Sequence, residues 1–264
     1  MDIIGYISFL FVGVSLGLIG GGGSILAVPI LVYLFNLPAD ISTSYSLFLV
    51  GASAAVGAYT YHRQGLIKYR IGFIFTVPAF LGVFLVRKFV MPSIPALIDV
   101  GFTSITKDQL ILGTFAIVML LASVSMIKDG KKESTESADL QSPNILLVTL
   151  EGLLVGGLTG FVGAGGGFLI IPALVLLTKM EMKNAVATSL LIIAVKSLFG
   201  FLGDLGNLQI DWLFIVILSF VSFAGLFLGK KIGEKISGSK LKKGFGYFVL
   251  IMGVYIIFKS VSTS

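Results

Sequence analysis

Two glycine clusters are the residues of this sequence whose types and spacing could do chemistry. Residues 20–24 read GGGGS inside the apolar run 3–35, and residues 163–167 read GAGGG inside a second apolar run. A proline follows each cluster at the same spacing, Pro29 or Pro172. Glycine weakens a helix by about 1 kcal/mol per residue relative to alanine, and lipid cannot satisfy the freed peptide groups. The clusters therefore predict a paired anion site, in which N–H groups of half-helices face the ligand. Its candidate ligands are Gly20, Gly21, Gly22, Gly23, Ser24, Gly163, Gly165, Gly166 and Gly167.

Close helix packing is the alternative role for these glycines. Glycines spaced four apart let membrane helices approach each other, and we assign this role to Gly13, Gly17, Gly152, Gly156 and Gly160. An engineered GGGGS linker is excluded, because the cluster has a second copy in the chain.

Hydroxyl side chains follow each glycine-containing run and form a second candidate layer. Thr43 and Ser46 lie three residues apart, on one helical face, and Thr188 and Ser189 follow the second run. We expect these four hydroxyls to contact the substrate. Alternatively, they bond carbonyl groups of their own helix or join neighbouring helices.

Lys196 lies within an apolar span and has no acid nearby in sequence. An intramembrane lysine costs about 2.5 to 3.5 kcal/mol on insertion scales and indicates function, here a positive charge for the anion. Alternatively, it snorkels to the interface or pairs structurally with an acid. Glu151 is a candidate proton carrier or counter-ion of Lys196, or an interfacial carboxylate. His62 and Arg63 would attract anions at the cytoplasmic mouth, or act only as a positive-inside anchor.

Several other chemistries are excluded by composition and motif. The chain has no cysteine and one histidine, which predicts no disulfide, no catalytic thiolate and no histidine-based metal centre. Neither glycine cluster continues into the Lys-Ser/Thr of a phosphate-binding loop. Asp204 follows Gly203, but the first glycine of the GxGD motif of intramembrane aspartyl proteases is absent. We therefore expect neither an enzyme nor a cofactor.

Composition identifies the elements that must position these residues. The 264-residue chain is 56% hydrophobic and 12% charged, with a mean hydropathy of +1.04, which predicts a polytopic membrane protein. Long unbroken apolar runs favour helices over barrel strands, so the fold class is all-α. The net charge of +6 is assigned to cytoplasmic loops rather than to nucleic-acid binding. Asp2 leads into the first apolar run without a basic segment, so we expect no signal peptide.

The chain also contains an internal repeat. An offset of 143 residues pairs Gly13 with Gly156 and holds without gaps from residue 13 to residue 88; after a shorter connection the offset becomes 131, as for Leu110 and Leu241. Two homologous halves follow from this match. The predicted domains are a first transmembrane repeat at 1–127, a polar cytoplasmic linker at 128–143 and a second transmembrane repeat at 144–264.

Each half is expected to hold four segments. The first is broken by glycines, at 3–35 and 145–177, and forms either a re-entrant hairpin or two thin spans. Simpler spans follow near 41–61, 71–90 and 110–127 in the first half, and near 185–202, 212–229 and 245–258 in the second.

Loop charges predict that the halves have opposite orientations in the membrane. The loop with Arg63, Lys68 and Arg70 is basic, whereas its repeat mate with Asp204 and Asp211 has no base. Conversely, the loop at 230–243 is rich in lysine, whereas its mate has mixed charges. Equivalent loops thus prefer opposite sides, as in inverted-topology repeats. Both termini are then expected to be extracytoplasmic, in a multi-pass protein of the cytoplasmic (inner) membrane.

The glycine motifs resemble those of the TauE/SafE sulfite exporter family, also called the toluene sulfonate uptake permease group. The resemblance rests on GLIGGGGS at 17–24 with Pro29, on GFVGAGGG at 160–167 with Pro172, and on YHRQG at 61–65. It implies a carrier of sulfur-containing anions such as sulfite, sulfonates, sulfoacetate or thiosulfate-like species, driven by an ion gradient. Uptake and export both occur in the family. Lys196 is outside the family pattern, and Ser24 stands where the second cluster has Gly167.

Together these observations predict a secondary transporter that works by alternating access, with a small anion as substrate, H⁺ or Na⁺ as coupling ion and the lipid bilayer as surroundings. An anion channel, which needs a continuous polar pore, and a non-transporting scaffold are the alternatives. The sequence leaves the oligomeric state open.

Overall fold

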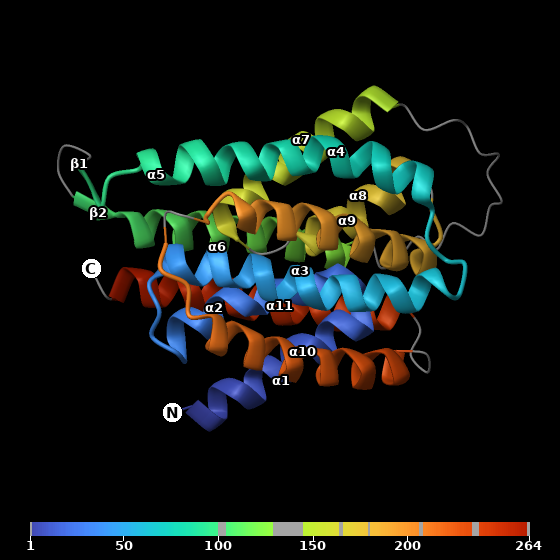
Figure 1. Ribbon diagram of the computed structural model, residues 1–264, viewed down its shortest axis with the longest axis horizontal. Helices are drawn as coiled ribbons and strands as arrows, with labels where there is room; N and C mark the ends of the chain where they lie inside the picture. Colours follow the sequence, from blue (N-terminus) through green and yellow to red (C-terminus); the bar gives the residue numbers. More distant parts are fainter. Residues whose placement is uncertain are drawn as a thin grey trace.

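The computed structural model describes residues 2–99, 104–128, 145–163, 166–178, 180–205, 208–233 and 238–262. Nearly all of these residues are helical (Figure 1). The first half contains α1 (Asp2–Ile19), the 3₁₀ helix η1 (Gly20–Leu26), α2 (Ala27–Tyr33), α3 (Ala39–His62), α4 (Tyr69–Leu85), the π-helix η2 (Val86–Val90), α5 (Met91–Ser93), β1 (Leu97–Asp99), β2 (Ser104–Thr106) and α6 (Lys107–Lys128). The second half contains α7 (Ile145–Val162), α8 (Gly167–Thr178), α9 (Met182–Leu202), α10 (Trp212–Gly233) and α11 (Gly238–Ser262).

The predicted helical membrane architecture is confirmed at the level of helix length and composition. Within the described residues, five helices are long and apolar enough to cross a bilayer: Ala39–His62, Tyr69–Ser93, Ile145–Val162, Lys183–Leu202 and Trp212–Gly233. An antiparallel hairpin of β1 and β2, in which Leu97 pairs with Thr106, interrupts the loop before α6 and was not predicted.

Each glycine-broken segment turns back on itself at its glycines. In the first segment, the ring of Tyr6 near the start lies 5.7 Å from the ring of Phe35 near the end. In the second segment, α8 returns toward the end of the bundle at which α7 begins (Figure 1). Both segments therefore have the shape of a hairpin. Their placement as re-entrant elements in a bilayer stays a prediction.

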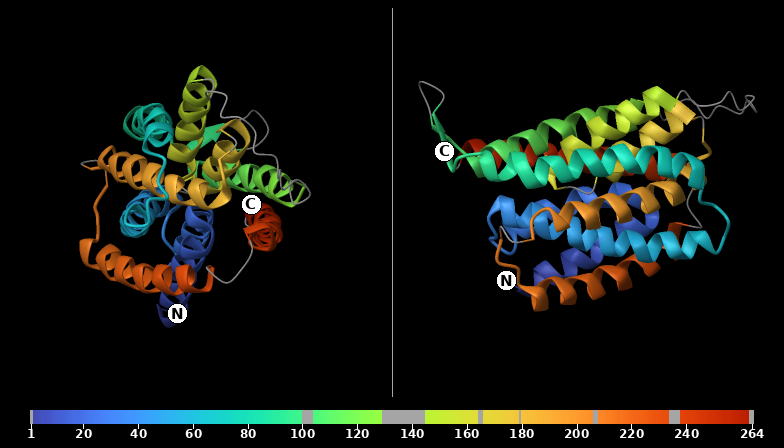
Figure 2. Two further views of the ribbon diagram at one scale, coloured as in Figure 1. Left: turned by 90° about the vertical axis from the view of Figure 1, so that its right-hand side faces the viewer. Right: turned by 45° about the horizontal axis from the view of Figure 1, so that its top comes forward.

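The packing of the helices is reciprocal between the two halves. α1 packs on α10, and α7, the repeat mate of α1, packs on α4, the repeat mate of α10. The mates α3 and α9 pack on each other, as do α6 and α11. In Figure 1, α3 and α9 run in opposite directions, as do α4 and α10, and Figure 2 shows the same interleaving from two further sides. Opposite directions are what inverted repeats require; the insertion of the halves in a membrane stays a prediction.

Glycine packing brings the first helix of each half against its partner. A Cβ atom on Gly13 would lie 2.0 Å from the carbonyl oxygen of Ser222, and a Cβ atom on Gly156, its repeat mate, 2.2 Å from that of Ala79. These distances leave no room for a side chain, because real Cβ atoms do not approach other atoms so closely. They support the packing role assigned to the isolated glycines.

Gly156→Ala should destabilise the protein, by about 1 to 3 kcal/mol, because overpacking forces α7 away from α4. Thermal unfolding in detergent measures the effect. Gly157→Ala is the matched control, because a Cβ atom there would lie 4.0 Å from its one neighbour, a methyl group of Val86. Equal melting temperatures of the two variants would contradict the close contact between the helices.

Candidate functional site

The two glycine clusters meet at the centre of the bundle. A Cβ atom on Gly167 would lie 2.1 Å from the Cα, C and O atoms of Gly21, and a Cβ atom on Gly21 would lie 2.5 Å from the Cα atom of Gly167. η1 and the start of α8 are thus in backbone contact. The clusters are 143 residues apart in sequence but adjacent in the structure. Gly165 lies outside the described residues.

Matching residues of the clusters share an unusual backbone conformation and reciprocal neighbours. Gly20 has φ +66° and Gly163 has φ +73°, values that L-residues with side chains rarely adopt. A Cβ atom on Gly20 would lie 3.4 Å from Oγ of Ser189, and one on Gly163 would lie 2.3 Å from Cβ of Thr43. The hydroxyl-bearing helix of each half therefore lies against the glycine turn of the other half.

Two of the four predicted hydroxyls, and that of Ser24 in the first glycine cluster, donate to nearby backbone carbonyls. Ser24 Oγ donates to the carbonyl of Gly21 at 2.7 Å, Thr43 Oγ1 to that of Asp40 at 2.8 Å, and Ser189 Oγ to that of Val186 at 2.8 Å. Ser46 is fully buried, and its hydroxyl has no hydrogen-bond partner among the described residues. Thr188 lies elsewhere on α9, where its Oγ1 accepts from the backbone N–H of Lys68 at 3.0 Å.

Lys196 lies beside the glycine centre. It is 0% exposed, so it does not snorkel to an interface. Its Nζ donates to Thr159 Oγ1 at 2.6 Å, and a Cβ atom on Gly166, just before α8, would lie 2.6 Å from that Nζ. Within the described chain, Lys196 forms no ion pair with a carboxylate. The Oε2 atom of Glu151 is buried without a partner there, so the counter-ion role proposed for Glu151 has no contact to support it.

His62 and Arg63 lie away from this centre, at the end of α3. The Nδ1 atom of His62 is hydrogen bonded to the hydroxyl of Tyr69. His62 and Tyr69 line a cavity of about 380 Å³ between α3, α4 and α9. Lys230 Nζ lies 5.1 Å from the centre of the Tyr61 ring, which places the basic end of α10 beside them. The structure thus gathers the predicted mouth residues at one end of the bundle.

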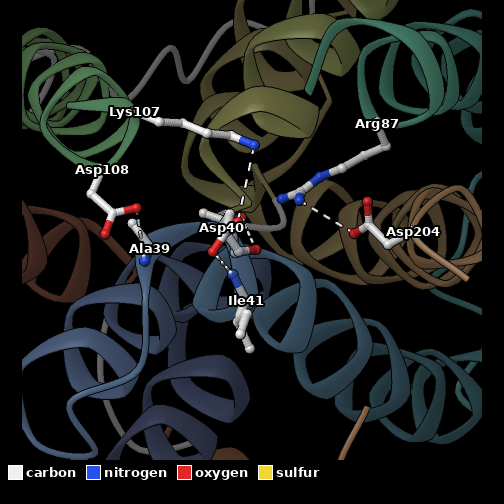
Figure 3. A network of polar contacts seen from close by, with 8 residues as sticks. Ala39, Asp40, Ile41, Arg87, Lys107, Asp108 and Asp204 are labelled. Atoms are coloured by element: carbon white, nitrogen blue, oxygen red, sulfur yellow. Dashed lines mark hydrogen bonds and ion pairs between the residues drawn. The ribbon is translucent and has the colours of Figure 1, made fainter. Parts of the chain in front are cut away.

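An ionic cluster that was not predicted lies at the opposite end of the bundle. Arg87 Nη1 lies 3.3 Å from Asp204 Oδ2, and both side chains are buried (Figure 3). Lys107 Nζ lies 4.0 Å from Asp40 Oδ2 in the same cluster. Burial raises the pKa of Asp204, and the guanidinium of Arg87 opposes that shift. A signal was available, because Arg87 lies inside the apolar run predicted at 71–90.

A bundle of apolar helices around a buried polar centre, with basic residues concentrated at one end, defines a polytopic helical membrane protein. The sequence profile described as "Sulfite exporter TauE/SafE" matches residues 6–256. The chain belongs to this family, as the glycine motifs indicated.

Curated relatives of similar length carry transporter names. A "Probable membrane transporter protein" of Xylella fastidiosa (strain 9a5c) is 31% identical, over 94% of this chain and 92% of its own. YdhB of Bacillus subtilis is 24% identical over 93% of this chain and 96% of its own. MJ0441 of Methanocaldococcus jannaschii is 26% identical over 97% of this chain and 93% of its own. Both are also named probable membrane transporter proteins. No solved structure matches the chain.

Proposed function

We propose that this protein is a secondary transporter that carries a small sulfur-containing anion, such as sulfite or an organosulfonate, across the cytoplasmic membrane. The observation that carries the proposal is the contact between Gly21 and Gly167. Two helix-breaking turns meet there in an apolar interior, beside a buried cation that has no ion-pair partner among the described residues.

The chemistry of this centre suits an oxyanion. The first N–H groups of a helix lack intrahelical partners and carry partial positive charge, and α8 begins at Gly167. The ammonium group of Lys196 lies against this helix start and adds a full charge. Ser46 supplies a hydroxyl that is not engaged by the described residues. An anion bound here would accept hydrogen bonds from these N–H, ammonium and hydroxyl groups, which the apolar surroundings cannot do.

The distribution of charge supports inverted repeats with both termini extracytoplasmic. Figure 1 places both chain ends at one end of the bundle and the α3–α4 connection at the other. Arg63 and Lys68 belong to that connection, Arg70 lies in the first turn of α4, and Lys230 lies beside the connection. Because basic loops remain in the cytoplasm, we assign the His62 end to the cytoplasm and the Arg87 end to the outside.

Burial of the centre supports alternating access rather than an open pore. Ser24, Ser46 and Lys196 are all 0% exposed, so an anion can reach them only after the bundle opens at one end. We assign the coupling ion to H⁺ or Na⁺.

Flux into proteoliposomes tests this proposal. Sulfite, sulfate, thiosulfate and an organosulfonate are offered one at a time, with proton and sodium gradients imposed separately. We expect saturable flux of a sulfur-containing anion that depends on one gradient. Absence of flux for every anion would refute the proposal, and single-channel conductance without gradient coupling would replace it with a channel.

A further inference from the structure

The second polar cluster, at the Arg87 end, has donors that its acid partner does not use. Arg87 is 1% exposed, and its Nη1 makes a single long contact of 3.3 Å with Asp204. The Nε and Nη2 atoms are buried and have no hydrogen-bond partner among the described residues. Leaving buried charged donors unpaired is costly, because their desolvation is not compensated.

The two unpaired atoms form a recognition edge. Nε–H and the nearer N–H of Nη2 lie on the same side of the planar guanidinium, parallel to each other. This fork matches two oxygens of a carboxylate, sulfonate or similar oxyanion, which is why arginine binds such groups bidentately. Nη1, on the other side, is the atom that faces Asp204.

The backbone around Arg87 is itself unusual. Arg87 lies in η2, the π-helical continuation of α4. Such turns occur mostly as single bulges within α-helices and are frequent at functional sites. Its neighbour Lys88 is exposed, whereas Arg87 points inward. A Cβ atom on Gly203 would lie only 3.2 Å from the Cβ atom of Arg87, so α4 and the end of α9 are in close contact at this position.

The contact also joins the two repeats. Arg87 belongs to the first half and Asp204 to the second, and Figure 3 shows their side chains reaching toward each other. Arg87 extends from η2 and Asp204 from the turn after α9. Any opening of this end that separates α4 from the end of α9 would break the pair. The guanidinium would then be left without its acid.

We propose that Arg87 is an outer anion-binding residue, and that the negative charge of Asp204 beside it weakens anion binding when this end is closed. The inference rests on the proposed function for its ligand class, a small sulfur oxyanion. During passage the anion would bind the Nε–Nη2 edge, and the return of Asp204 would release it. The remaining charged side chains of the cluster, Asp40, Lys107 and Asp108, lie nearby (Figure 3).

The single tryptophan of the chain offers a local probe. Trp212 lies at the start of α10, 6.0 Å ring to ring from Phe201 of α9. It shares the wall of a cavity of about 240 Å³ with Leu205, the residue that follows Asp204. Binding at Arg87 that displaces Asp204 should therefore change its fluorescence.

The experiment titrates purified protein with sodium sulfite and sodium sulfate, against sodium chloride at equal ionic strength, and follows Trp212 emission. A Lys196→Met background removes the charge at the glycine centre, so that the remaining signal reports the outer site. We expect a saturable response that Arg87→Gln abolishes. Asp204→Asn should tighten apparent binding about tenfold or more, since the negative charge next to the bound anion is removed.

A charge-swapped variant separates binding from structure. Arg87→Asp combined with Asp204→Arg keeps an ion pair between the helices, so it should restore thermal stability without restoring the response to the anion. A response that survives Arg87→Gln, or an Asp204→Asn variant with unchanged affinity, would overturn the inference. Flux is measured in protein that retains Lys196. Flux there, together with a fluorescence response that is independent of Arg87, would refute the outer site alone. An Arg87-dependent response without flux in the protein that retains Lys196 would refute the proposed transport function alone.

Discussion

Lys196→Met should make the protein more stable and at the same time abolish anion transport. Lys196 is completely buried, and among the described residues its ammonium contacts only a hydroxyl, that of Thr159. Removing such a charge should stabilise the fold by about 2.5 to 3.5 kcal/mol, because an intramembrane lysine costs about that much to insert. The hydroxyl of Thr159 keeps its own hydrogen bond to the carbonyl of Gly156 at 3.2 Å. Thermal unfolding and proteoliposome flux are measured on the same preparation.

Opposite signs of the two effects distinguish a functional lysine from a structural one. If Lys196 only held α9 against α7, its loss would lower stability and flux together. Thr159→Val is the matched control, because it removes the partner and leaves the charge. We expect this variant to be less stable and to retain measurable anion affinity. Full transport by Lys196→Met would show that the anion does not need the charge.

Gly167→Ala should abolish transport, although alanine is the smallest possible addition. The new Cβ atom would lie 2.1 Å from the backbone of Gly21, so the two clusters would have to separate. Overpacking of this kind costs about 1 to 3 kcal/mol, and the displaced N–H groups would no longer converge on one anion. Flux and thermal unfolding are both measured, after confirming that the variant reaches the membrane.

Two further glycines provide controls for this variant. Gly113→Ala should leave transport intact and stabilise α6 by up to about 1 kcal/mol, because no atom of the described residues beyond its own stretch of helix lies within 4 Å of the added Cβ. Gly225→Ala creates an equally severe clash, 2.1 Å from the carbonyl oxygen of Leu10, at the contact between α1 and α10. It should lower stability and leave the KM for the anion unchanged. A Gly167→Ala variant with wild-type flux would refute the glycine site.

The helices were predictable because their signals are local. An apolar run of about 20 residues indicates a span whatever surrounds it, and the predicted runs at 41–61 and 212–229 correspond to α3 and α10. The pairing of α1 with α10 was not predictable in this way. It depends on Gly13 and Gly225 fitting together in space, and spacing alone does not reveal which helix receives a glycine face.

The candidate site was predicted only in part, because some of its features are local in sequence and others depend on long-range contacts. The duplicated clusters indicated two equivalent turns, and the structure places Gly21 against Gly167. The hydroxyls of Thr43 and Ser189 were predicted to be ligands, yet each donates to the carbonyl three residues earlier. The sequence does not distinguish a hydroxyl that binds substrate from one that bonds its own helix. Arg87 was overlooked because the pairing of α4 with the end of α9 is long-range. Whether these residues bind an anion stays a prediction.

The exchange of first helices between the halves has a consequence for biosynthesis. α1 is among the first parts of the chain to be made, but α10, against which its glycine face packs, follows about 200 residues later. During that interval the Gly13 face of α1 must be covered by lipid or by the insertion machinery. The linker at 128–143 separates two stretches of sequence, but cutting there would give two pieces, each with its first helix uncovered. Two such pieces produced together should find each other and assemble, whereas either piece produced alone should be degraded.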